Sequence, residues 1–181
     1  MRRILIIFTA ALIFLGFSLQ GVASAAGEHY VGFKTGFVKI DPEAAGVTID
    51  AIIPVGVLYG YNLTPDIAVE VEVNFGVSGG DVEASWLPGE SGEVDVWTGA
   101  VYIVAHPTIV DKLYLKLKAG MMYSDQNITF DTLNVDEKTI EKDFHAWGGL
   151  GYKATDKITT EIEYTSIDDT DLVSIGVNYL F

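Results

Sequence analysis

The chain has 181 residues, which is enough for one domain and too few for two comfortable ones. Its formal charge of −14, with no cluster of basic residues, excludes a surface that binds nucleic acid. The absence of cysteine excludes a fold held together by disulfides, so stability has to come from an apolar core or from lipid.

The first 25 residues have the three parts of a secretory signal peptide. Arg2 and Arg3 form a positive start, an apolar run follows over residues 4–19, and Ala23-Ser24-Ala25 matches a small-residue cleavage site. An uncleaved membrane anchor is the alternative, because the apolar run is close to the lower limit for a span. Since no basic stop-transfer segment follows, we expect a signal peptide over residues 1–25 and one domain over residues 26–181.

Removal of residues 1–25 takes away Arg2 and Arg3 and no acidic residue, which leaves 9 basic against 25 acidic residues, a formal charge of −16. No second apolar run is long enough for a transmembrane helix. Whether the mature chain spans a membrane therefore depends on its strands.

Eight segments of the mature chain alternate between apolar and polar or small residues, and no helical period persists. They cover residues 30–40, 51–61, 67–77, 95–105, 113–123, 144–153, 158–166 and 172–181. The connections alternate in length: those at 62–66, 106–112 and 154–157 are short, whereas 41–50, 78–94 and 124–143 are long and acidic. The last, 167–171, is shorter but equally acidic. Short turns at one end and long loops at the other are typical of a transmembrane β-barrel, with periplasmic turns and extracellular loops.

The two faces of these segments differ in charge. In the third segment Val69, Val71 and Val73 alternate with Glu70 and Glu72, and charge recurs on only one face of the fifth to seventh segments. We expect the uncharged face to meet lipid and the charged face to line the lumen.

The outward aromatic residues sort into two girdles, as expected at the two membrane surfaces. One set lies at the periplasmic strand ends: Tyr59, Tyr61, Tyr152, Tyr179 and Phe181. The other lies at the extracellular ends: Phe37, Phe75, Tyr123, Phe144 and Tyr164.

Two segments are less regular. Pro54 lacks a ladder donor, so we expect a bulge or a strand start near it. Residues 95–105 are apolar on both faces, and the aromatic belt favours Tyr102 pointing outward and Trp97 pointing inward.

The inward charges have roughly equal numbers of both signs. They are predicted to form one lumen network: Lys34, Glu70, Glu72, Lys116, Lys118, Lys153, Glu161 and Glu163. Because buried charges need partners and a small eight-stranded barrel is filled by side chains, we interpret the network as a structural plug. A gated ion path is the alternative.

Three histidines are the candidates for chemistry near neutral pH. His29 starts the first strand and His106 lies in a turn, so both are predicted to be surface residues, whereas His145 should point inward near the extracellular mouth, beside Asp143. No Ser or Cys falls on its face, so we expect no catalytic residue. The acidic loops lack the ligand spacing of a calcium loop, so we expect no metal site and no cofactor, and weak divalent bridging to anionic lipid headgroups is a separate hypothesis.

The chain resembles the small outer-membrane β-barrel domain family, the OmpA/OmpX-like eight-stranded barrels of Gram-negative bacteria. The resemblance covers the mature chain and rests on 30–37 (YVGFKTGF), 56–66 (GVLYGYNLTPD), 113–120 (LYLKLKAG) and the terminal Val177-Asn-Tyr-Leu-Phe181. It implies an all-β, antiparallel, up-and-down eight-stranded barrel in the cell outer membrane. It also implies that the barrel-assembly machinery reads the alternate residues Ile175, Val177, Tyr179 and Phe181.

We therefore expect a monomeric, non-enzymatic barrel with a structural or surface-interaction role, whose partners are outer-membrane lipid and lipopolysaccharide and not nucleic acid. A narrow channel or small-solute transporter is the alternative. Lipid A deacylases of this shape carry a His-x-Ser pair that His145-Ala146-Trp147 lacks, so a lipid A-modifying enzyme is less favoured. A soluble lipocalin-like barrel would need a polar outer face, and here that face is apolar.

Overall fold

The computed structural model describes residues 26–40, 47–49, 52–77, 80–84, 91–130, 136–167 and 170–181. The predicted signal peptide, residues 1–25, lies outside them. Their regular structure is all strand: β1 (His29–Ile40), β2 (Val47–Ile49), β3 (Pro54–Thr64), β4 (Ile67–Gly76), β5 (Gly80–Ala84), β6 (Ser91–Ala105), β7 (Thr108–Val110), β8 (Leu113–Phe130), β9 (Asp136–Lys153), β10 (Ile158–Ile167) and β11 (Thr170–Leu180). The described residues contain no helix that is long and apolar enough to cross a membrane.

The sheet closes on itself. Neighbours run in the order β6-β4-β3-β1-β11-β10-β9-β8, and β8 pairs with β6. The seam between first and last strands is continuous from Tyr30↔Leu180 to Ile40↔Thr170, and every pairing is antiparallel. The predicted eight-stranded barrel is thereby confirmed, and closure leaves no open edge in the barrel wall facing lipid.

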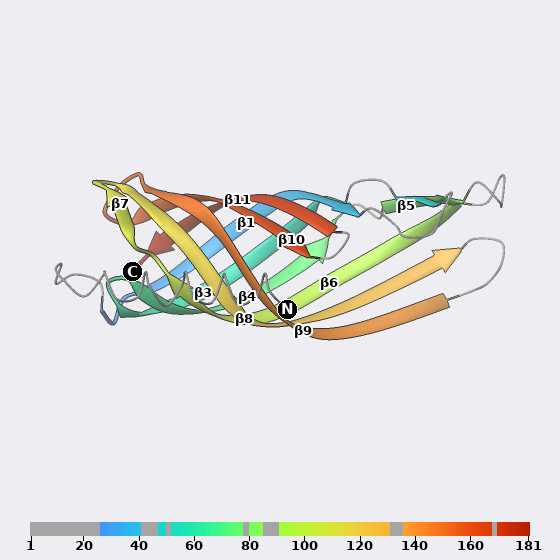
Figure 1. Cartoon of the computed structure of the whole chain (residues 1–181), viewed down its shortest axis with the longest axis horizontal. Coiled ribbons are helices and arrows are strands. Elements are labelled where there is room, and N and C mark those ends of the chain that lie inside the picture. The colour runs from blue at the N-terminus through green and yellow to red at the C-terminus, as the bar shows by residue number, and fades with distance from the viewer. Residues whose placement is uncertain are drawn as a thin grey trace, which may run out of the picture.

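β6, β8 and β9 extend beyond the barrel at one end (Figure 1). We call this the ribbon end; the turn end, opposite, holds the short connections, β7 and the C terminus. The β8–β9 ladder continues from Tyr123↔Lys142 to Thr129↔Asp136, where the sequence predicted a loop, and β5 pairs with β6 and β2. The prediction was wrong here because most residues of this ribbon are polar, so apolar alternation is lost while the backbone ladder continues.

The outer surface of the barrel is apolar and exposed, and the inner surface is polar and buried. Val71, Val101 and Ile162 on the outer face are 46%, 53% and 57% exposed, whereas Glu70 and Lys116 on the inner face are fully buried. A contiguous apolar surface of this extent is not stable against water and fits contact with lipid.

The two aromatic girdles lie as predicted. At the turn end the outward rings are exposed, and His29 contacts Tyr59, Tyr61 and Phe181. The exposed rings at the ribbon end are Phe37, Phe75, Trp97, Phe144 and Tyr164. Tyr123 is half-buried against Trp97, with ring centroids 5.1 Å apart.

The predicted orientation of residues 95–105 is wrong. Tyr102 is buried inside the barrel at 1% exposure, and Trp97 is 40% exposed on the outside. The reason is cross-strand pairing: Tyr102 lies opposite Glu70 on β4, and Trp97 lies opposite Phe75. Directly paired residues share a face, so the charges on β4 determine the inner face of β6. Pro54 is the first residue of β3, in agreement with the expected strand start.

Candidate functional site

Seven of the eight predicted lumen charges come together inside the barrel. Lys34 lies on β1, Glu70 and Glu72 on β4, Lys116 and Lys118 on β8, and Glu161 and Glu163 on β10. In the ring of eight strands β1 lies opposite β8, and β4 lies opposite β10. Basic and acidic walls therefore alternate at each quarter of the circumference.

Each lysine bridges the two acidic walls. Lys116 Nζ lies 3.2 Å from Glu70 Oε2, 2.5 Å from Glu161 Oε2 and 2.9 Å from Glu163 Oε1. Lys118 Nζ pairs with Glu70, with Glu72 at 2.9 Å and with Glu163 at 3.3 Å. Each of these two lysines therefore pairs with carboxylates on β4 and on β10, which lie on opposite sides of the lumen.

The third lysine repeats this arrangement nearer the ribbon end. Lys34 Nζ pairs with Glu72 Oε1 on β4 and lies 3.8 Å from Glu163 Oε2 on β10. The Asn74 amide also donates to Glu72, at 2.8 Å, and to Thr98, at 2.9 Å. Glu72 is thereby held from both sides.

Two tyrosines complete the network at the turn end. Tyr30 Oη donates to Glu70 Oε2 at 3.0 Å, and Tyr114 Oη donates to Glu161 Oε1 at 2.7 Å. Among the seven buried charges there are four carboxylates and three ammonium groups, so these two donors stabilise the excess negative charge. Alternation places Tyr114 on the same face as Lys116 and Lys118, and Tyr30 on that of Gly32 and Gly36, but neither tyrosine was predicted to join the network.

Glycine makes room for both rings. Tyr30 lies opposite Gly60 on β3, and Tyr114 lies opposite Gly151 on β9. A Cβ at either glycine would overlap the facing ring, so these positions require glycine for close approach. Each tyrosine therefore crosses the neighbouring strand and reaches a carboxylate beyond it.

Lys153 does not join the network, contrary to its predicted place. Its side chain is exposed at the turn end of β9, where Lys153 still pairs with Thr159 on β10, and the described residues form no ion pair with it. Alternation assigns a face but not a depth, and Lys153, as the last residue of the strand, lies at the end of the barrel beyond the buried charges.

His106 is the second correction, since it was predicted to be a surface residue. Its ring packs edge-on against Tyr114 at 5.4 Å and Tyr30 at 6.4 Å, so it covers the turn end of the network. Burial lowers the pKa of His106 to about 4, nearby Lys116 lowers it further, and Glu161 opposes that shift. The other two histidines lie as predicted: His29 is at the turn-end surface, and His145 is half-buried near Trp147.

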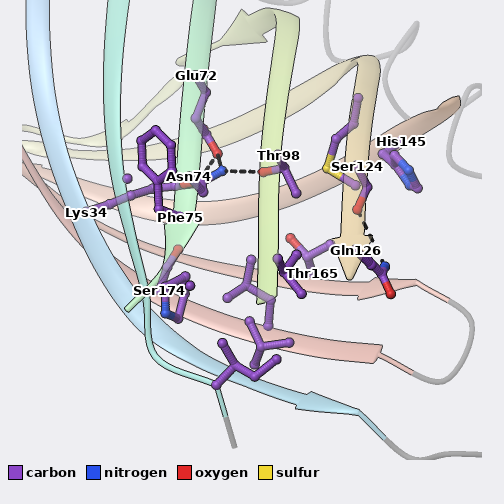
Figure 2. A pocket seen from close by; sticks show the side chains of 18 of the residues that line it. Lys34, Glu72, Asn74, Phe75, Thr98, Ser124, Gln126, His145, Thr165 and Ser174 are labelled. Atoms are coloured by element: carbon purple, nitrogen blue, oxygen red, sulfur yellow. Dashed lines mark hydrogen bonds and ion pairs between the residues drawn. The ribbon is translucent and has the colours of Figure 1, made fainter. Parts of the chain in front are cut away.

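Above the network, toward the ribbon end, lies a cavity of about 190 Å³ (Figure 2). All eight barrel strands contribute to its lining, and Lys34 and Glu72 belong both to it and to the network. Figure 2 shows Asn74, Thr98 and Ser124 around it on neighbouring strands. The described residues contain no group of three or more His, Cys, Asp or Glu side chains placed to hold a metal ion.

The predicted assembly residues share the outer face of β11. Ile175, Val177, Tyr179 and Phe181 are between 46% and 59% exposed. Phe181 N donates to His29 O at 2.9 Å, which ties the end of the chain to the first strand.

The closed barrel, its apolar belt and its charged interior define a transmembrane β-barrel of the cell outer membrane. The outer membrane protein beta-barrel domain family matches residues 8–181, and the chain belongs to this family. No curated protein sequence matches it.

Solved structures share the fold at low identity. Neisserial surface protein A has a TM-score of 0.62 at 12% identity, covering 84% of this chain and 97% of that one. Outer Membrane Protein W of E. coli has a TM-score of 0.56 at 12% identity, covering 87% and 99%. Ail, the attachment invasion locus protein of Yersinia pestis, in complex with the heparin analogue sucrose octasulfate, has a TM-score of 0.53 at 16% identity, covering 86% and 97%.

Proposed function

We propose that this protein is a non-enzymatic outer-membrane barrel whose lumen is closed by ion pairs and whose acidic ribbon end faces the exterior, in a structural or surface-interaction role. The observation that carries the proposal is that Lys34, Lys116 and Lys118 each pair with carboxylates on both β4 and β10. A network that ties opposite walls together at several levels leaves no continuous aqueous path.

An ion that entered the lumen would have to break these pairs. Removing one partner of a buried pair leaves an uncompensated charge, at a cost of about 3–5 kcal/mol. Since Tyr30, Tyr114 and His106 also cover the turn end, a hydrated ion would meet aromatic rings on leaving the network. This favours a plug over a gated path.

The ribbon end supplies the surface for partners. Exposed Glu141 and Asp143 lie on β9 where it leaves the barrel, and the whole chain is acidic. Such a surface suits cationic groups, or anionic lipid and lipopolysaccharide bridged by divalent cations, and repels free polyanions. An acidic surface of this kind thus differs from the surface expected of a barrel that binds a sulfated sugar, as Ail does in its complex with sucrose octasulfate.

An enzymatic role has little support in the lumen. The ring of His145 lies 6.3 Å from that of Trp147, and the next residues on its face of β9 are Trp147 and Gly149. Neither offers a nucleophile. Mass spectrometry of lipid A from cells with and without the protein should give identical spectra, and a changed acyl pattern would reject the non-enzymatic assignment.

Conductance in planar lipid bilayers tests the closed lumen. We expect purified protein, inserted in concentrated KCl, to give no reproducible conductance steps, because the ion pairs span the barrel. Gel migration before and after boiling verifies that the same preparation is a folded barrel. Regular steps from folded protein would support the alternative, a narrow channel or small-solute transporter.

A further inference from the structure

The cavity at the ribbon end is not needed for the plug. It measures about 190 Å³ and is enclosed by side chains from every strand of the barrel. An engineered apolar protein cavity of about 150 Å³ admits benzene, so a ligand the size of one aromatic ring fits this volume. The cavity is therefore large enough for a small organic molecule and too small for an oligosaccharide.

The charges around the cavity favour a cation. Its only lysine, Lys34, is paired with Glu72 at the floor. At the mouth stand Glu141 and Asp143, both exposed and neither ion-paired within the described part of the chain. The uncompensated charge around the space is therefore negative, which attracts ammonium groups and repels carboxylates and phosphates.

The remaining lining suits a compact apolar body. Apolar side chains enter from five strands or their flanks: Val38, Ile52, Val96, Met122 and Leu172. Trp147 adds the apolar area of its indole ring, which lies 6.0 Å from Lys118 Nζ. Its Nε1 is buried and has no hydrogen-bond acceptor among the described residues, and Asn74 Oδ1 likewise has no donor. Both groups line the cavity and are free to bond a ligand or water.

We infer that this cavity is a binding site for a small organic ammonium ion with a compact apolar body, such as an arylalkyl amine. The ammonium group pairs with Glu141 and Asp143 at the mouth, and the apolar body lies against Trp147 and Met122. The site does not depend on a closed lumen, because Glu141, Asp143, Trp147 and Met122 are not members of the ion-pair network.

The test uses three probes of equal size and different charge: 2-phenylethylamine, 2-phenylethanol and phenylacetate. The barrel is labelled with ¹⁵N in detergent micelles, and each probe is titrated while the indole N–H signals are followed. Trp147 reports on the cavity, whereas Trp97, exposed on the outer face, reports on partitioning into the micelle. The chain has three tryptophans, so Trp147→Phe and Trp97→Phe assign two of the three indole signals and the remaining signal belongs to Trp86.

We expect the amine to shift the Trp147 signal saturably, with Trp97 unmoved. Two partly exposed carboxylates make the amine bind about tenfold more tightly than the alcohol, and phenylacetate should not bind. The double variant Glu141→Gln, Asp143→Asn should bind amine and alcohol equally well, whereas Asp156→Asn at the turn end should behave as wild type. These exposed side chains make no ion pair or side-chain hydrogen bond within the described residues, so the variants keep the fold.

Three results would overturn the inference. They are an unshifted Trp147 signal at millimolar amine, equal binding of amine and alcohol to wild type, and saturable binding of phenylacetate. A saturable shift with a neutral hexose and none with the amine would also reject the ammonium ion in favour of a sugar.

Discussion

Lys116 is the most highly connected charge in the lumen. Its fully buried ammonium group pairs with Glu70, Glu161 and Glu163, so Lys116→Met leaves three carboxylates without their common partner. We expect a loss of about 3–5 kcal/mol in the free energy of unfolding, measured by urea titration in micelles. Lys153→Met, which removes an exposed lysine, should change it by less than about 0.5 kcal/mol. Equal effects of the two substitutions would show that the network does not stabilise the barrel.

His106 makes stability depend on pH. The folded barrel lowers its pKa from 6.5 to about 4, so the unfolded chain binds a proton that the folded chain does not as pH falls through this window. Stability is therefore full above pH 6.5 and decreases toward pH 4. His106→Phe keeps a ring between Tyr30 and Tyr114 but cannot titrate. We expect its urea midpoint to fall less than that of wild type between neutral pH and pH 5, and an identical decrease would contradict the assignment.

At the scale of the strand, alternation predicts most of the barrel and fails where its physical cause is absent. The contrast between lipid and lumen produces the alternation, so all eight barrel strands could be predicted from it. Most residues of the β8–β9 ribbon are polar, so the sequence shows no alternation there, and only the backbone ladder marks the ribbon as strand. In β6 both faces are apolar, and the pairing of Tyr102 with Glu70, a long-range contact, was needed to orient it.

The same reasoning applies to the lumen network. Alternation placed Lys34, Glu70 and Lys116 on the inner faces of their strands. It thereby predicted them as neighbours, because only one face of each strand reaches the lumen. It could not predict that Lys153 is exposed at the end of β9 or that His106 packs against Tyr30 and Tyr114, since both depend on the geometry of the turn end. Which carboxylate each lysine meets depends on register, which alternation does not give.

β11 allows the assembly signal to be separated from stability. Phe181 is 59% exposed, and among the described residues the only aromatic ring it stacks on is that of His29, so Phe181→Ser should leave refolding in micelles nearly unchanged. If the assembly machinery reads this residue, the amount of folded barrel in outer-membrane fractions should fall several-fold. Phe37→Ser, an equally exposed ring at the other end of the neighbouring strand β1, is the matched control. Equal losses with the two variants would contradict a terminal signal.

For the whole molecule, lipid performs the role that a core performs in a soluble protein. The buried interior contains charges and tyrosines, and most large apolar side chains point outward. The network fills the lumen, and the apolar belt sets the position in the bilayer. The two parts therefore respond to different substitutions. Loss of a buried charge in the network should destabilise the barrel in any detergent. The cost of a charge added to the apolar belt should depend on its depth in the membrane.

The cost in stability of an added charge should depend on its depth in the membrane. This dependence tests whether the apolar outer surface of the barrel spans the bilayer. Val71 lies in the middle of the outer face of β4: it pairs with Tyr59 on β3, and it lies between Val69, which pairs with Tyr61, and the girdle residue Phe75. Val71→Arg should destabilise the barrel by about 2–4 kcal/mol in lipid bilayers, because the guanidinium is placed near the midplane. Ile109→Arg, in exposed β7 at the turn end, should cost only about 0–1 kcal/mol. Urea unfolding from vesicles measures both, and equal costs at the two depths would mean that the apolar face does not lie across the hydrocarbon layer.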